Sequence, residues 1–172
     1  MPEFTPVLVR ADIEKSVAEV AARISSDYRD RDLILIGVLK GAFVFLSDLI
    51  RQLSIDVRID FVGASSYSSG TSSTGRIRLT KEIEIDIKDK DVLIIEDIVD
   101  TGLTLTFLID YVKSLHPKTV KVCALIDKRE RRDAMVPVDY ACHVVAKGFL
   151  VGYGLDYDEK YRNLPGIYHM KL

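Results

Sequence analysis

Hydrophobic positions in the first fifty residues follow two different periods. Between residues 13 and 24, apolar side chains recur every three or four positions, the spacing of an amphipathic helix, and Asp12 is placed to cap its first turn. Residues 33–38 are continuously apolar and rich in branched side chains, as in a strand buried on both faces. A second amphipathic stretch covers residues 43–53. This part of the chain therefore predicts a helix followed by a strand-loop-helix unit.

The middle of the chain predicts further strands and one more helix. The apolar runs that indicate strands cover residues 55–64, 92–95 and 120–126. A helical pattern over residues 103–115 ends at His116 and Pro117, because proline cannot continue a helix. Strands that alternate with helices favour a parallel sheet with right-handed crossovers. We therefore expect an α/β fold with a central parallel β-sheet flanked by helices.

Three segments depart from this pattern. Residues 65–75 are almost entirely Ser, Thr and Gly, with Tyr67 as the only large side chain, so we expect a mobile lid. Residues 76–87 alternate apolar and charged side chains, which suits a half-solvated antiparallel pair. From residue 140 onward the chain is strand and loop with many aromatics, and we expect a small hood, built from both chain ends, that includes about 140–172. No repeat or linker divides residues 1–172, which predicts a single domain.

Charge and cysteine usage narrow the class of protein. The 24 Lys and Arg residues are interspersed with 26 Asp and Glu residues for a formal net charge of -2, so no nucleic-acid or membrane surface is expected. The N-terminus carries acidic residues and prolines instead of a signal sequence, and no apolar run is long enough to span a bilayer. We expect a cytoplasmic protein. Cys123 and Cys142 lie in apolar runs and predict buried thiols, and the histidines share no ligand spacing.

The residues after the 92–95 run carry the candidate chemistry, because ligands of open α/β sheets bind beyond the carboxyl ends of the strands. Two adjacent carboxylates, Glu96 and Asp97, precede a short turn and the start of a helix. The first N–H groups of a helix have no partner within it and can bind an anion. Gly102 would let a phosphate approach the backbone, and the hydroxyls of Thr101 and Thr104 can donate to it. A ribose 5-phosphate would satisfy the acids and the anion site together.

A simpler interpretation is that Asp100 or Thr101 only caps the helix and that the acids end a solvated strand. The whole run VLIIEDIVDTGLT, however, resembles the phosphoribosyl pyrophosphate (PRPP) signature of type I phosphoribosyltransferases. Resemblance to the hypoxanthine-guanine branch of that family extends through LIGVLKGAFVF, SSYSSGTSSTG, DKRERR and FLVGYGLDYDEKYRNLPGIY. It implies Mg2+-dependent transfer of phosphoribose from PRPP to N9 of a 6-oxopurine, hypoxanthine and guanine among them, in purine salvage, giving IMP or GMP and pyrophosphate.

The resemblance assigns roles to the residues at matching positions. The PRPP ribose and 5′-phosphate are expected to contact a set in the signature: Glu96, Asp97, Asp100, Thr101, Gly102, Leu103 and Thr104. Pyrophosphate is expected to contact the loop of Leu39, Lys40 and Gly41, together with Arg162. The expected lid residues are Ser66 and Tyr67, and the expected metal-linked carboxylates are Glu96, Asp97 and Asp156. The purine is expected to contact Lys128, Phe149 and Leu150.

Physical chemistry supports the purine assignments. An ammonium has donors and no acceptor, so Lys128 would favour a 6-oxo base and reject the 6-amino group of adenine. Phe149 would stack on the base and Asp100 would accept the purine N7 proton while N9 attacks the ribose. Without the resemblance, a surface lysine is the less favoured interpretation of Lys128, whereas a core residue is the favoured interpretation of Phe149. Lys147 and Gly148 stand where the family has a proline and an acidic residue, and Leu150 replaces a more usual valine.

Two other functions fit part of this pattern. A PRPP-sensing regulator would keep the sugar-phosphate site and add a helix-turn-helix or a basic stripe, and neither is evident in the sequence. A phosphoribosyltransferase for another base, such as xanthine or uracil, would keep the chemistry. Lys128 with an aromatic stack fits 6-oxopurines better than pyrimidines, although xanthine also has a 6-oxo group. The resemblance also implies a homodimer or homotetramer whose partners are PRPP and a 6-oxopurine.

Overall fold

The computed structural model describes residues 1–67 and 76–171, so most of the predicted lid lies outside the described residues. The elements follow one another in this order: β1 Glu3–Leu8, α1 Arg10–Asp27, β2 Leu33–Leu39, α2 Phe43–Ile50, β3 Arg58–Tyr67, β4 Arg76–Lys81, β5 Asp91–Val99, α3 Leu103–Ser114, β6 Thr119–Lys128, β7 Tyr140–Val145, β8 Leu150–Val151 and β9 Ile167–Lys171. Across the two described ranges, no helix is long and apolar enough to cross a membrane.

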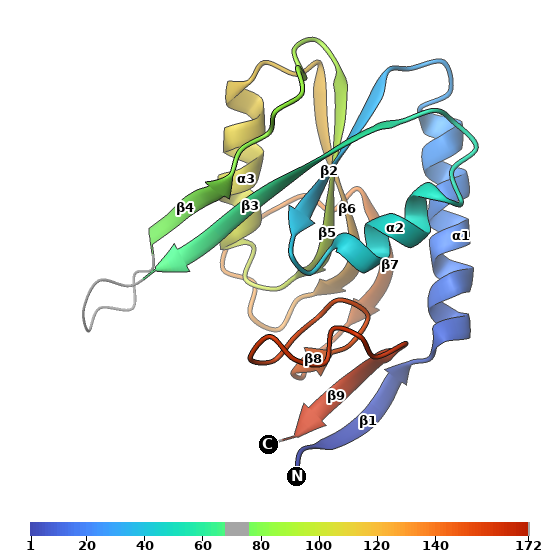
Figure 1. Ribbon diagram of the computed structural model, residues 1–172, viewed down its shortest axis with the longest axis vertical. Helices are drawn as coiled ribbons and strands as arrows, with labels where there is room; N and C mark the ends of the chain where they lie inside the picture. Colours follow the sequence, from blue (N-terminus) through green and yellow to red (C-terminus); the bar gives the residue numbers. More distant parts are fainter. Residues whose placement is uncertain (68–75, 172) are drawn as a thin grey trace.

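Within the described residues, six strands form the main sheet in the order β4-β3-β2-β5-β6-β7. All neighbours in it are parallel except β3 and β4, which are antiparallel. Helices α1 and α2 lie on one side of this sheet and α3 lies on the other (Figure 1). The prediction of a central parallel sheet flanked by helices is therefore confirmed.

Alternate side chains of the central strands form two separate cores. Leu33 and Leu35 of β2 pack in the cluster that contains Phe45 of α2 and the apolar face of α1. Ile34 and Ile36 point to the opposite face and pack in the cluster that contains the apolar face of α3. Both sets are almost fully buried. The continuous apolar run read from the sequence is thus explained by two packed faces.

A separate small sheet in the order β1-β9-β8 forms the hood, and it carries both chain termini (Figure 1). The hood was expected to include the chain from about residue 140. Strand β7 instead pairs with β6 in the main sheet, where Tyr140 is buried and its hydroxyl donates to Asp27 of α1 at 2.6 Å. The C-terminal part of the hood therefore begins only at β8.

Several predicted boundaries were wrong for local reasons. Helix α1 begins at Arg10 with Val9 as its N-cap, so Asp12 lies inside the first turn and does not cap it. Strand β3 begins at Arg58 and continues to Tyr67, into the segment expected to be a lid. Strand β4 ends at Lys81, because the following chain is held by Asp60, whose carboxylate accepts hydrogen bonds from two backbone N–H groups, those of Glu84 and Ile85.

The contact between β7 and α1 predicts a loss of stability in acid. His143 Nε2 lies 2.6 Å from the hydroxyl of Ser16, and burial lowers the pKa of His143 although Asp12 and Glu19 of α1 oppose this. The unfolded chain therefore binds a proton at this histidine before the folded chain does, so the free energy of unfolding decreases as the pH falls below about 6.5. Denaturant titrations at pH 7.5 and 5.5 should show a larger acid loss for the wild type than for His143→Gln, and equal losses would contradict this.

Candidate active site

The carboxyl ends of three adjacent strands, β2, β5 and β6, lie side by side at one edge of the main sheet, next to the hood (Figure 1). The loop after β2 begins at Lys40, the loop after β5 at Asp100, and the loop after β6 at Arg129. Because these strands are parallel, all three loops emerge at the same edge. The predicted site residues from distant parts of the sequence are therefore brought together.

Glu96 is a buried carboxylate and Asp97 a half-buried one near the carboxyl end of β5, which continues past them to Val99. Burial raises the pKa of Glu96 well above its ordinary value, and the negative charge of Asp97 raises it further. Burial also raises the pKa of Asp97, although its hydrogen bonds and the charge of Arg162 act in the other direction. Neither carboxylate forms a salt bridge within the described residues, and Glu96 is buried, so the pair is not a solvated strand end.

This carboxylate pair has the composition of a Mg2+ site. Magnesium is usually held by one or two carboxylates, and waters and substrate phosphates complete its shell. In the described part of the chain, no group of three or more His, Cys, Asp or Glu side chains could hold a metal alone. As an adjacent carboxylate pair, Glu96 and Asp97 fit a magnesium ion whose remaining ligands come from outside the protein. Asp156 is a third carboxylate in the hood, and it pairs with Arg162 at 3.2 Å.

The loop after β2 packs against Asp97 and the hood. A Cβ atom added to Gly41 would lie 1.7 Å from Asp97 Oδ2, and one added to Gly154 would lie 2.2 Å from the carbonyl oxygen of Gly41. The Leu39–Lys40 peptide bond is cis. Gly41 therefore has no room for a side chain, and the predicted pyrophosphate loop, the acid pair and the hood meet at this point.

The turn before α3 has the geometry expected of an anion site. Gly102 is the N-cap, with φ of 84°, and Leu103 is the first helical residue, whose N–H donates to the Thr101 hydroxyl at 3.3 Å. Asp100 makes no capping bond, so the interpretation of Asp100 as a simple helix cap is wrong. Thr104 is exposed. This turn and the end of β5 line a pocket of about 120 Å³.

Asp100 and Lys128 face each other across the ends of β5 and β6. Asp100 Oδ2 lies 3.6 Å from Lys128 Nζ and 3.8 Å from Arg131 Nη1. The other carboxylate oxygen of Asp100, Oδ1, is buried without a hydrogen-bond partner in the described structure. Lys128 is only 6% exposed, so its interpretation as a surface lysine is wrong. The two side chains present a donor and a free acceptor side by side.

The hood contributes an aromatic side chain and a backbone edge. Phe149 is 49% exposed and makes an edge contact with Tyr157, with 5.7 Å between ring centroids, so it is not a core residue. Leu150 is buried in β8 and pairs with His169 of β9. The half-open face of Phe149 is available to a planar ligand.

Two site features were missed from the sequence. Arg132 donates to the carbonyl oxygens of Asp100 at 3.0 Å, Val99 at 3.2 Å and Lys128 at 3.0 Å, and it pairs with the buried Asp127 carboxylate. Glu159 in the hood bridges the cations of Lys40 and Arg162. Both residues lie in segments that carried the resemblance, DKRERR and DYDEKYR, but spacing alone does not indicate which charges of such a run point inward.

The lid residues are only partly described. Ser66 and Tyr67 end β3 and pair with Ile77 and Arg76 of β4. The predicted lid residues 68–75 lie outside the described residues, so the lid stays a prediction.

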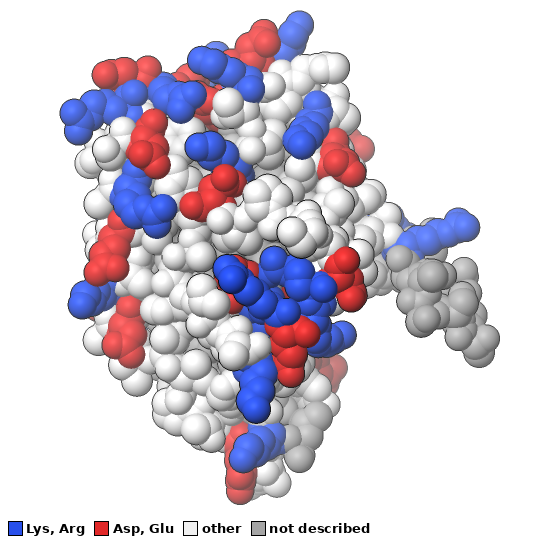
Figure 2. Space-filling view, turned by 180° about the vertical axis from the view of Figure 1, so that it is seen from behind, with Lys and Arg blue, Asp and Glu red and all other residues white. Residues whose placement is uncertain are grey.

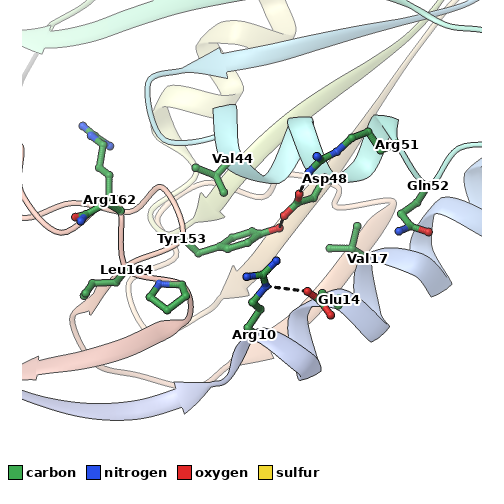
Figure 3. A pocket seen from close by; sticks show the side chains of 12 residues that line it. Arg10, Glu14, Val17, Val44, Asp48, Arg51, Gln52, Tyr153, Arg162 and Leu164 are labelled. Atoms are coloured by element: carbon green, nitrogen blue, oxygen red, sulfur yellow. Dashed lines mark hydrogen bonds and ion pairs between the residues drawn. The ribbon is translucent and has the colours of Figure 1, made fainter.

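A larger cavity of about 420 Å³ lies between α1, α2 and the hood (Figure 3). There Tyr153 of the hood donates to Asp48 of α2, which also pairs with Arg51. Arg162 belongs to its lining, but its side chain points away from this polar group (Figure 3).

On the face seen in Figure 2, basic and acidic side chains are interspersed.

Comparison with known proteins places this site in a family. Residues 9–158 match the phosphoribosyl transferase domain. A hypoxanthine-guanine phosphoribosyltransferase of Mycobacterium avium is 43% identical over 172 residues, which cover 96% of this chain and 85% of the relative. A solved structure of a hypoxanthine-guanine phosphoribosyltransferase from Bacillus anthracis has a TM-score of 0.91 and 40% identity, with full coverage of both chains.

A third relative has been studied for assembly. The structure of the Trypanosoma cruzi hypoxanthine phosphoribosyl transferase, described for the role of its C-terminal region on the oligomeric state and enzymatic activity, has a TM-score of 0.91 and 38% identity, over 98% of this chain and 93% of that one. These matches extend over the β5–α3 turn, the three strand ends and the hood. The chain therefore belongs to the phosphoribosyl transferase family, in its hypoxanthine-guanine branch.

Proposed function

We propose that this protein transfers the 5-phosphoribosyl group of PRPP to N9 of a 6-oxopurine, hypoxanthine or guanine, and releases pyrophosphate. The observation that supports this most strongly is the pairing of buried Lys128 with Asp100 at 3.6 Å, beside a phosphate-binding turn. A 6-oxopurine has an acceptor at O6. The adjacent N7 is a donor when N7 carries a proton. Lys128 would donate to O6, and the free Oδ1 of Asp100 would accept from N7.

The turn before α3 would bind the sugar phosphate. The backbone N–H groups of the first turn of α3, which have no partner within the helix, would donate to the 5′-phosphate together with the hydroxyls of Thr101 and Thr104. Glu96 and Asp97 would accept from the ribose hydroxyls, directly or through water, and would hold Mg2+ together with Asp156. Bound Mg2+ would neutralise charge on the departing pyrophosphate. Lys40, the Gly41 amide and Arg162 would orient that group.

Asp100 would act as the general base. As the bond between N9 and ribose C1 forms and the bond from C1 to pyrophosphate breaks, the proton on N7 would pass to the Asp100 carboxylate. Stacking of the base on Phe149 would hold the purine plane in the half-open space at the hood. Adenine would bind poorly, because its 6-amino group would place a donor against the Lys128 ammonium.

Initial-rate assays with PRPP, Mg2+ and one base at a time test this proposal. We expect turnover with hypoxanthine and guanine and none with adenine, and a xanthine arm measures the breadth of 6-oxo recognition. Activity with adenine alone would refute the role given to Lys128. We also propose that the protein assembles as a homodimer or homotetramer, which light scattering after size-exclusion chromatography would test.

A further inference from the structure

The two cations proposed to bind pyrophosphate are already bridged by one carboxylate. Glu159 Oε2 lies 2.8 Å from Lys40 Nζ, and Glu159 Oε1 lies 3.2 Å from Arg162 Nη2. Lys40 follows β2 in the main sheet, whereas Glu159 and Arg162 belong to the hood loop. The Glu159 carboxylate therefore joins the two parts of the predicted pyrophosphate site through the contacts that a phosphate oxygen would make.

We propose that Glu159 is a positioning residue that occupies the place of pyrophosphate in the free enzyme and must be displaced when pyrophosphate or PRPP binds. This inference rests on the proposed function, because it takes Lys40 and Arg162 as pyrophosphate contacts. It assigns to Glu159 the control of how tightly the site holds the leaving group.

The backbone delivers the Glu159 carboxylate from a tight turn. Tyr157 and Lys160 exchange backbone hydrogen bonds of 3.1 and 3.0 Å, and the two residues between them have positive φ, 51° at Asp158 and 61° at Glu159. Two consecutive left-handed residues form the type of turn that favours Asn and Gly, and a glutamate there is intrinsically unfavourable. The Glu159 N–H also donates to Asp156 Oδ2 at 2.9 Å. The turn is thus tied to the hood beside the proposed site.

The members of this bridge differ in how firmly they are held. The Arg162 side chain is 19% exposed and donates to the Gly154 carbonyl oxygen at 2.7 Å, and it also pairs with Asp156. Lys40 and Glu159 are 66% and 63% exposed. Pyrophosphate could therefore displace the Glu159 carboxylate while Arg162 stays in place. The positive charges are kept in position and neutralised until the ligand arrives.

Competition between the Glu159 carboxylate and pyrophosphate should change the measured dissociation constant of pyrophosphate. When a site is open for only part of the time, the apparent dissociation constant increases by the reciprocal of the open fraction. Exposed ion pairs are individually weak, so removing this competitor should tighten binding by about three- to tenfold and no more. The gain should shrink at high salt, because salt screens exposed pairs. A residue with only a structural role would weaken binding when it is replaced.

Calorimetric titration of Mg2+-pyrophosphate into the full-length protein tests the proposal with three variants. Glu159→Gln keeps the shape of the side chain and removes its charge, and we expect about three- to tenfold tighter binding with unchanged thermal stability. Asp158→Asn is the matched control, because it removes one negative charge from the same turn, at a side chain whose only ion pair within the described structure is with Lys160, at 3.9 Å. We expect the control to stay within about twofold of the wild type.

The outcomes distinguish a failure of the role given to Glu159 from a failure of the proposed function. Wild-type binding with no gain in Glu159→Gln would overturn the role of Glu159 and leave the proposed function intact. An equal gain in both variants would show a general charge effect and would also overturn it. If the wild type failed to bind Mg2+-pyrophosphate at all, the pyrophosphate assignment itself would be wrong. In steady-state assays, the expected signature of Glu159→Gln is a lower KM for PRPP without a rise in kcat.

Discussion

The variant Asp100→Asn is expected to lower kcat by about a hundred- to ten-thousandfold, with a modest change in PRPP binding. Asparagine has the shape of aspartate but cannot take a proton from N7. Asp100 Oδ2 lies 3.6 Å from Lys128 and 3.8 Å from Arg131, whereas Oδ1 is buried without a hydrogen-bond partner in the described structure, so one oxygen stays available to accept from a ligand. Initial rates at saturating hypoxanthine, with calorimetric titration of PRPP, separate the loss of chemistry from a loss of binding.

The same substitution at an exposed site controls for a general effect. Asp110 lies on α3 and is exposed, so Asp110→Asn should keep wild-type rates and stability. Turnover of Asp100→Asn near the wild-type rate would remove Asp100 from the mechanism. A large loss of PRPP affinity with little change in kcat would instead assign Asp100 to the binding of the sugar phosphate.

The fold could be predicted from the sequence wherever burial fixes the pattern. The 33–38 run has no polar position and is short and rich in branched side chains, which favours a strand buried on both faces, and β2 fulfils this. Boundaries were less certain, because they depend on single hydrogen bonds. The N–H groups of Glu84 and Ile85 bond to the Asp60 carboxylate instead of extending β4, and no local pattern reveals a partner so far away in the sequence.

Strand β7 shows a second limit of predicting the fold from the sequence. Residues 140–145 have a mixed burial pattern, and the sequence does not indicate whether such a strand joins the main sheet or the hood. Tyr140 contributes to the choice, because its hydroxyl donates to Asp27 at the end of α1. That contact joins residues 113 positions apart. Periodicity predicts that a strand exists, but the partner of a strand is set by tertiary contacts.

For the site, the sequence predicted the residues whose chemistry is unusual at their position. Adjacent acids at the end of an apolar strand and a glycine before a helix can be recognised without a structure. Charged residues in a charged run cannot, and the run from Lys128 to Arg132 holds three arginines with different environments. Side-chain exposure is 69% for Arg129, 66% for Arg131 and 17% for Arg132. Only the packing of the loop against β5 distinguishes them.

The buried arginine leads to the second large expected effect. Arg132→Gln should lower the free energy of unfolding by about 2–4 kcal/mol, because it removes hydrogen bonds to three carbonyl oxygens and one partner of a buried carboxylate. It should also lower turnover by about ten- to a hundredfold at temperatures where the variant is folded. The reason is geometric, since Arg132 fixes the backbone of Asp100 relative to that of Lys128. Denaturant unfolding and initial rates measure the two effects.

Arg129→Gln is a matched control within the same loop. Arg129 pairs with the same Asp127 carboxylate at 3.0 Å, but its side chain is 69% exposed, so its loss should cost at most about 1 kcal/mol and leave turnover unchanged. The Asp127 pairing is common to both variants, and the bonds to the backbone of β5 and β6 are lost only in Arg132→Gln. If both variants lost stability and turnover equally, the loss of a cation beside the Asp127 carboxylate would explain both effects. A loss confined to Arg132→Gln would mean that the distance between the proposed base and the proposed purine-recognition lysine is set by this one guanidinium.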